Sequence, residues 1–407
     1  MTIVDKNIPD LRFPEFNDNW KERKIKEITQ RYVNPAEINP DVYYREIGIR
    51  SHGKGLFHKK PILGKELGNK RVFWIKENAF ILNIVFAWEQ AIGKTTEKEI
   101  GMIASHRFPM YFPKENKSSI DFLLYFFLTK KGKILLELAS PGGAGRNKTL
   151  GQKEFDNLKF QIPSIQEQQK IALFLNTVDE KIRQLEKKKN LFTEYKKGII
   201  QKFFSQQIRF KKIDCTNYFN WEEKRLEEIL LEHGLKSTGM EKVFSVSVNK
   251  GLVDQIEHLG RSVSSDNLDN YKIVKPNDIV YTKSPTGDFP FGIIKQSKLT
   301  NDVIVSPLYG VFTPITPELG YILDSYFESS LNTYNYLSAL IQKGAKNTIN
   351  ISNKTFLSKT IKIPVEKEEQ IKIVDFFKGL DAELENISIQ LEKTKNFKKG
   401  LLQKMFV

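Results

Sequence analysis

Apolar side chains recur at alternating steps of four and three residues along two long stretches of the chain, at about 165–204 and 366–406. This spacing places them on one side of an α-helix and is typical of a coiled coil. Lys196 and Lys398 interrupt the two stripes and would fix the register of pairing. We therefore predict two long helices that cover each other's stripes. The residues expected at this helix pairing are Ile171, Leu175, Val178, Ile182 and Leu185 in the first helix and Ile373, Phe377, Leu380, Leu384 and Ile387 in the second.

The stretches ahead of these helices, roughly 20–160 and 221–361, show a different pattern. Short runs of β-branched and aromatic residues alternate with turn residues, which predicts strands, and each stretch also contains one apolar helical segment. The chain is thus expected to be α+β. The predicted strands are 71–75, 79–82 and 103–105 in the first stretch and 271–274, 278–281 and 303–306 in the second, and the predicted short helices are 120–128 and 321–327.

The same blocks of sequence occur twice, about 201 residues apart. The segment 19–28, which contains Trp20, returns as 220–229 with Trp221, and Lys196–Phe204 returns as Lys398–Phe406. Such a duplication predicts two copies of one structural unit and of one binding surface. If the long helices pair antiparallel, a pseudo-two-fold axis relates the two halves. The repeated tryptophans are expected to seat each domain on the helices.

The amino-acid composition indicates which class of partner the chain would bind. The 407 residues include 64 Lys and Arg against 49 Asp and Glu, a net charge of +15, which favours a polyanion and nucleic acid before membrane. A lysine-coated soluble protein is the plainer alternative. The single Cys215 excludes an internal disulfide framework and a cysteine metal cluster. The start of the chain has no apolar signal region, and the apolar run 122–128 is too short to span a membrane, so a cytoplasmic protein is expected.

Further repeated residues flank the domains and begin the helices. Arg12-Phe13 returns as Arg209-Phe210, and Pro163…Glu167-Gln168…Asp179 returns as Pro364…Glu369-Gln370…Asp381. In this order and register, these residues resemble those of specificity subunits of type I restriction–modification systems, over essentially the whole chain. The resemblance implies two target-recognition domains, each followed by a conserved spacer helix, with the helices paired as an antiparallel coiled coil. The segments would be 1–161 and 207–362 for the domains, and 162–206 and 363–407 for the helices.

The resemblance also implies a function and a set of partners. Each recognition domain would read one half of a bipartite, asymmetric site in double-stranded DNA, and the paired helices would set the gap between the halves. Two modification subunits would dock on the helices and methylate adenine with S-adenosylmethionine. Restriction subunits would add cleavage that depends on ATP and Mg. This chain would itself be non-catalytic and bind no cofactor or metal.

Catalytic motifs would contradict this expectation, but the nearest matches in the sequence are incomplete. An adenine methyltransferase needs an Asn/Asp-Pro-Pro-aromatic tetrad, and the nearest match, 34–37, lacks the second proline and the aromatic residue. The glycine-rich run 142–149 is not a phosphate loop, because Asn147 stands where Gly must precede Lys148. The five histidines show no metal-ligand spacing. Two alternatives stay open: a stand-alone DNA-modifying enzyme, and a coiled-coil interaction protein without DNA specificity.

Candidate DNA contacts are polar and basic side chains on glycine-jointed segments, because such side chains reach base edges and phosphates. Three clusters occupy corresponding places in the two halves. The candidates are Arg50, Ser51, His52 and Lys54, with Lys250 in the second half; Trp88, Gln90 and Lys94, with Lys283, Ser284 and Thr286; and Arg146, Asn147 and Lys148, with Lys346, Asn347 and Asn350.

Overall fold

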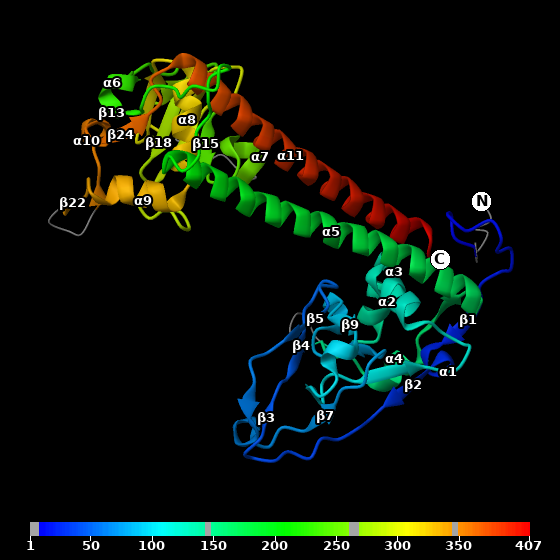
Figure 1. The fold of residues 1–407 in the computed structure, drawn as a ribbon. Helices are drawn as coiled ribbons and strands as arrows, with labels where there is room; N and C mark the ends of the chain where they lie inside the picture. The colour runs from blue at the N-terminus through cyan, green and yellow to red at the C-terminus, as the bar shows by residue number, and fades with distance from the viewer. Residues whose placement is uncertain (1–7, 143–147, 260–267, 344–348) are drawn as a thin grey trace. The chain divides into compact units, whose positions relative to one another are not determined.

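The computed structural model describes residues 8–142, 148–259, 268–343 and 349–407. The chain forms two compact units: the first contains Met1–Glu186 and Ile389–Val407, and the second contains Lys187–Ser388. The division falls inside the two long helices, α5 (Ile165–Phe204) and α11 (Lys367–Lys404), which Figure 1 shows in green and red. Each unit therefore includes the first part of one long helix and the last part of the other.

The first unit is built on a four-stranded antiparallel sheet in the order β2-β11-β8-β9, which comprises Thr29–Tyr32, Met110–Pro113, Phe80–Leu82 and Ile92–Lys94. Strand β1 (Lys21–Lys24) pairs with β12 (Lys159–Ile162), so the beginning and the end of the domain lie together. The other elements before α5 are α1 (Ile25–Ile28), β3 (Tyr43–Tyr44), β4 (Ile47–Ile49), β5 (Leu56–His58), β6 (Ile62–Leu63), η1 (Gly64–Leu67), β7 (Val72–Trp74), η2 (Ala87–Glu89), η3 (Glu97–Glu99), β10 (Ile103–Ser105), α2 (Ile120–Leu128), α3 (Lys130–Leu138) and α4 (Gln152–Asn157).

The second unit repeats this topology. Its four-stranded sheet has the order β14-β21-β18-β19, which comprises Leu230–Glu232, Gly310–Pro314, Ile279–Thr282 and Ile293–Gln296, and β13 (Glu222–Arg225) pairs with β24 (Thr360–Ile363). The remaining elements are α6 (Leu226–Ile229), β15 (Phe244–Ser247), β16 (Gly251–Asp254), α7 (Gln255–Leu259), β17 (Lys272–Val274), β20 (Val303–Val305), α8 (Pro317–Phe327), α9 (Ser330–Ser338), β22 (Gln342–Lys343), β23 (Ile349–Asn350) and α10 (Asn353–Leu357). The duplication predicted from the sequence is thus a duplication of fold.

Most predicted elements are present with small shifts of their ends. The helices predicted at 165–204 and 120–128 have those bounds, and the predicted strands are each confirmed within one or two residues. Helix α8 begins at Pro317, four residues before the predicted start at 321. The side chain of Thr316 accepts a hydrogen bond from the Leu319 amide, and Pro317 occupies the first helical turn, where its missing N–H is not needed.

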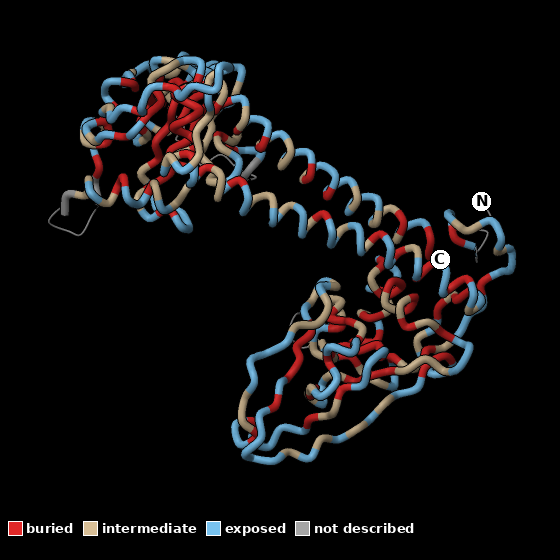
Figure 2. The backbone as a smooth tube through the Cα atoms, viewed as in Figure 1, coloured by how far each residue is buried: buried red, intermediate tan, exposed pale blue. Residues whose placement is uncertain are grey.

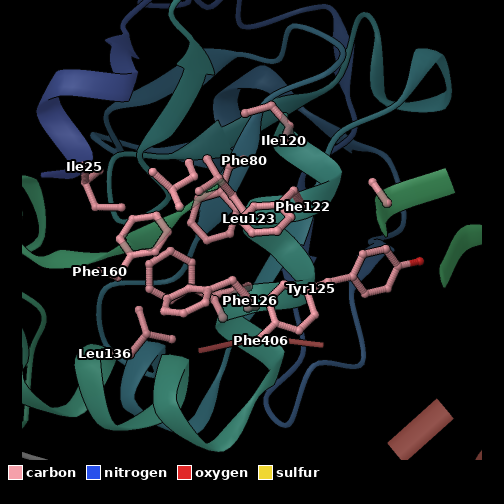
Figure 3. Close-up of a cluster of buried hydrophobic side chains, with 14 of the residues drawn as sticks. Ile25, Phe80, Ile120, Phe122, Leu123, Tyr125, Phe126, Leu136, Phe160 and Phe406 are labelled. Carbon is pink, nitrogen blue, oxygen red and sulfur yellow. The ribbon is translucent and has the colours of Figure 1, made fainter. Parts of the chain in front are cut away.

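The core of the first unit joins three parts of the chain. Rings from α2, among them Phe122 and Phe126, pack with Phe160 of β12 and with Phe406, just beyond the end of α11 (Figure 3). Figure 3 also shows the hydroxyl of Tyr125 turned away from this ring cluster. In Figure 2 the buried positions recur along the long helices, as the apolar stripes require.

Ion pairs show the direction in which the long helices pair. In the first unit, Lys398 near the end of α11 contacts Asp179 near the start of α5 at 2.6 Å. In the second unit, Lys188 of α5 contacts Glu383 of α11 at 2.9 Å. The end of one helix therefore lies beside the start of the other, and the pairing is antiparallel. Among the described residues, no helix is long and apolar enough to cross a membrane.

The stripe residues also pack against the domains. Ile171, Leu175 and Val178 share a core with α2 and with the end of α11, whereas Ile373, Phe377 and Leu380 share a core with α8 and with the end of α5. Leu185 and Ile387 are buried, and Ile182 and Leu384 are partly buried. Each stripe thus packs against a helix and a domain.

Candidate nucleic-acid interface

A buried carboxylate attaches each domain to the start of its long helix. In the first unit Glu167 accepts hydrogen bonds from Arg12 at 2.7 and 2.8 Å and from the indole N–H of Trp20 at 3.3 Å. The bond to Glu167 raises the pKa of the Arg12 guanidinium. In the second unit Arg209 binds Glu369 at 2.9 and 3.1 Å. The arginine of the repeated Arg-Phe motif and the glutamate of the repeated Glu-Gln motif therefore have a structural role, because they bind each domain to its long helix.

The tryptophans have the structural position expected of them. Trp20 is 2% exposed and belongs to the core that includes Ile171 of α5. Trp221 is also buried, and its ring meets that of Phe204 edge to face at 6.0 Å between centroids. Both rings thus pack where a domain meets a long helix.

Both units carry a two-stranded hairpin at the same place in the topology. In the first unit β4 and β5 are joined by residues 50–55, which we call the first tip, and in the second unit β15 and β16 are joined by residues 248–250, the second tip. Gly55 and Gly251 follow at corresponding positions with φ of 72° and 67°, a backbone conformation that favours glycine. The two hairpins occupy the same place in the topology and both have a lysine directly before this glycine, while their other tip residues differ.

The backbone of the first tip is hydrogen-bonded to the loop between β8 and β9. The amides of His52 and Gly53 donate to the carbonyls of Glu89 and Gln90 at 2.6 and 2.9 Å. His52 has a φ of 61°, which is uncommon for a residue other than glycine. The ammonium group of Lys148 lies 5.5 Å from the centre of the Trp88 ring. The described members of all three sequence-predicted clusters thus come together in the first unit.

Some of the predicted side chains in these clusters already bind other residues of the protein, and others are exposed. Gln90 donates its side-chain amide to the Phe127 carbonyl at 2.8 Å, and Lys94 binds Asp121 at 2.8 Å. These two side chains support α2. Arg50, His52 and Lys54 are exposed, Ser51 is partly exposed, and the Arg50 guanidinium lies 5.0 Å from the centre of the Phe57 ring.

In the second unit Lys250 is exposed at the second tip, and Lys283, Ser284 and Thr286 follow β18. Burial lowers the pKa of Lys283, and the nearby Lys272 lowers it further. Ser284 and Thr286 are exposed, and the Thr286 amide donates to the Phe289 carbonyl across a tight turn.

Some predicted residues receive no test from this structure. Arg146, Asn147, Lys346 and Asn347 lie outside the described residues, and Asn350 ends strand β23.

A groove of about 1840 Å³ borders the second tip. It is lined by 248–252, by the facing parts of α5 and α11, and by residues of α8. Basic and acidic side chains are both present in it, among them Lys298 and Asp324, which pair at 3.1 Å. The groove is therefore not a uniformly positive channel.

Sequence reasoning missed one polar network that both units contain. In the second unit Lys196 is buried and contacts Glu328 at 2.7 Å and Asp381 at 2.5 Å, and Asp381 also accepts a hydrogen bond from Tyr321. In the first unit Asp179 accepts from Tyr125 at 2.8 Å and pairs with Lys398. Burial, together with the adjacent carboxylate, raises the pKa of both tyrosines. The sequence feature that could have indicated this network is the lysine that interrupts the apolar stripe of each long helix.

Comparison with known proteins agrees with this architecture. Residues 17–192 match the family model of the type I restriction modification DNA specificity domain. The type I restriction enzyme MjaVIII specificity subunit of Methanocaldococcus jannaschii is 24% identical over 313 residues, which cover 71% of this chain and 70% of that protein. The putative type I restriction enzyme MjaX specificity subunit of the same organism is 22% identical over 295 residues, covering 69% and 67%.

Solved structures share the fold along nearly the whole length. The type I restriction-modification system S subunit from M. genitalium has a TM-score of 0.58 at 14% identity and covers 98% of this chain and 99% of its own. A structure described under complex assembly and conformational transition of the type I R-M system has a TM-score of 0.53 at 15% identity, covering 95% and 97%. The repeated motifs, the duplicated fold and the family match over residues 17–192 make this chain similar to the specificity subunits of type I restriction–modification systems.

Proposed function

We propose that this chain is the non-catalytic subunit that gives a type I restriction–modification complex its DNA sequence specificity, with one half of a split, asymmetric site read by each recognition domain. The observation that carries the proposal is the pair of hairpins, which occupy the same place in the two domains but have tips of different sequence. Two domains of the same fold can read different bases only through residues that differ. The net charge of +15 supports a DNA partner, since phosphate contacts supply most of the affinity.

The proposed division of labour has four segments. Residues 1–161 and 207–362 form the recognition domains, and residues 162–206 and 363–407 form the spacer helices that set the gap. Two modification subunits that carry S-adenosylmethionine dock on the helices, and restriction subunits supply cleavage with ATP and Mg. Assembly with such partners would take place in the cytoplasm.

Selection of bound sequences from a random duplex library tests the proposal. The chain is co-expressed with a modification subunit of the same system, and the bound duplexes are sequenced. We expect two short specified halves separated by an unread gap of fixed length. Binding without sequence preference, governed by salt alone, would instead indicate an interaction protein. Methylation or cleavage by this chain alone would establish the stand-alone enzyme.

A second prediction concerns the spacer helices. Insertion of seven residues into both α5 and α11 keeps the stripes in phase, because a heptad closes two turns of a coiled coil. We expect such a variant to select the same two half-sites with a longer gap. Insertion into α5 alone makes the two helices unequal in length, so both ends of α5 can no longer pair with their partner segments of α11, and this should abolish binding. A matched insertion that changed the bases selected would refute the division between domains and helices.

A further inference from the structure

The two hairpins are suited to enter DNA, because the major groove admits a two-stranded β-ribbon. Each hairpin is fixed at its base by apolar packing. Ile47 and Ile49 of β4 belong to one buried cluster of the first unit, and Val246 and Leu252 pack in a cluster of the second. The tips carry exposed polar side chains, among them Arg50, Lys54 and Asn249. Each ribbon is therefore anchored at its base and polar at its end.

The first tip is also held in a defined conformation before any ligand binds. The Arg50 amide donates to the Gly55 carbonyl at 2.9 Å and closes the tip, and the two bonds from His52 and Gly53 fix it to the loop behind. A side chain carried on such a backbone loses less freedom on binding than one on a free loop.

The two tips share one lysine and differ in their other polar residues. Lys54 and Lys250 each stand directly before the left-handed glycine. A lysine present in both copies cannot distinguish two half-sites, and it suits the phosphate backbone, which is the same everywhere. Arg50 and Asn249 have no counterpart in the other tip, and both are exposed.

The chemistry of these two residues selects different bases. Arg50 presents the donors of a planar guanidinium, which match the N7 and O6 acceptors of guanine, and its position over Phe57 restricts its orientation. Asn249 offers one donor and one acceptor group, which match the N7 and N6 of adenine. Among the described residues, neither side chain has a hydrogen bond or an ion pair, so both can pair with a base.

We propose that both hairpins enter the major groove as β-ribbons, with Arg50 contacting guanine in one half-site and Asn249 contacting adenine in the other. This inference rests on the proposed function and adds the bases that the tips read. It predicts a G·C pair that depends on the first domain and an A·T pair that depends on the second.

The test uses the full chain with its modification subunit and the random duplex library. Arg50→Lys keeps the charge but removes the two-pronged contact, and Asn249→Ala removes the amide. Each variant is expected to lower discrimination at one base pair by on the order of ten- to a hundred-fold, in different halves of the site. Lys54→Ala is the matched control. It should weaken binding to all sequences alike and reduce the slope of log affinity against log salt by about 1.

The outcomes distinguish a failure of the proposed base contacts from a failure of the proposed function. If the wild-type chain selects a split site and Arg50→Lys and Asn249→Ala select the same bases with unchanged discrimination, the assignment of the tips is wrong while the proposed function stands. Uniform weakening by Arg50→Lys or Asn249→Ala would place that residue on phosphate and also overturn the assignment. If the wild-type chain selects no motif, the proposed function itself fails. Circular dichroism of each variant checks that a change in discrimination does not come from loss of the fold.

Discussion

Replacement of Phe406 by alanine is expected to destabilise the first unit by about 3–5 kcal/mol, the range for removal of a buried phenylalanine ring. Phe406 is only 5% exposed, and its ring centre lies 5.2 Å from that of Phe122. The truncation leaves a cavity among rings that belong to α2. Hydrogen exchange measured by mass spectrometry should therefore accelerate in peptides from α2 and β12, about 250 to 280 residues earlier in the sequence.

A neighbouring aromatic residue provides the control. Phe397 lies nearby in the last turns of α11 but is 55% exposed, so Phe397→Ala should change stability by no more than about 0.5 kcal/mol. Faster exchange confined to residues 187–388 in the Phe406→Ala variant would contradict the assignment of Phe406 to the core of the first unit.

Replacement of Lys196 by alanine is expected to destabilise the second unit by about 3 kcal/mol, the lower part of the range for loss of one partner of a buried ion pair. The lower part applies because the Glu328 side chain is 41% exposed and can regain water. Asp381 keeps Tyr321 and Lys298 as neighbours but loses its 2.5 Å contact. Lys197→Ala is the matched control, since Lys197 is exposed and pairs with the exposed Glu194.

The network predicts a pH dependence of defined sign. Burial raises the pKa of Asp381, but Lys196, Tyr321 and Lys298 outweigh it and lower the pKa below its ordinary value of 3.8. A carboxyl group with a depressed pKa stabilises the folded state above its unfolded pKa and loses this effect as the pH falls through the folded pKa. The stability difference between wild type and Asp381→Asn should be constant above about pH 5 and shrink towards pH 3. Urea unfolding at a series of pH values measures it, and a difference that grew towards pH 3 would contradict the network.

The long helices and the duplicated α+β fold could be predicted from the sequence, because both leave periodic or repeated signals. A stripe such as that from Ile171 to Leu185 follows from helical geometry, and the repeat of Trp20 as Trp221 follows from duplication. The start of α8 was less accessible, because it depends on the Thr316 cap rather than on a stripe.

The use of individual polar side chains could not be predicted, because it depends on partners distant in the sequence. Nothing near Lys94 indicates that Asp121 binds it, and nothing near Gln90 indicates that its amide supports the end of α2. The convergence of the first tip with the loop behind it depends on hydrogen bonds across about 40 residues. The sequence could nominate polar clusters but could not sort engaged side chains from available ones.

The composition of the units has a consequence for synthesis. Domains generally fold in the order in which they leave the ribosome, the N-terminal one first. Here the first unit needs Leu401, Met405 and Phe406 for its core, whereas the second unit is complete at Ser388. At about 5–20 residues per second, the first domain must wait roughly 10–40 s for its last helical segment. A nascent chain that is cut short near its end would therefore lose the integrity of the domain that was made first.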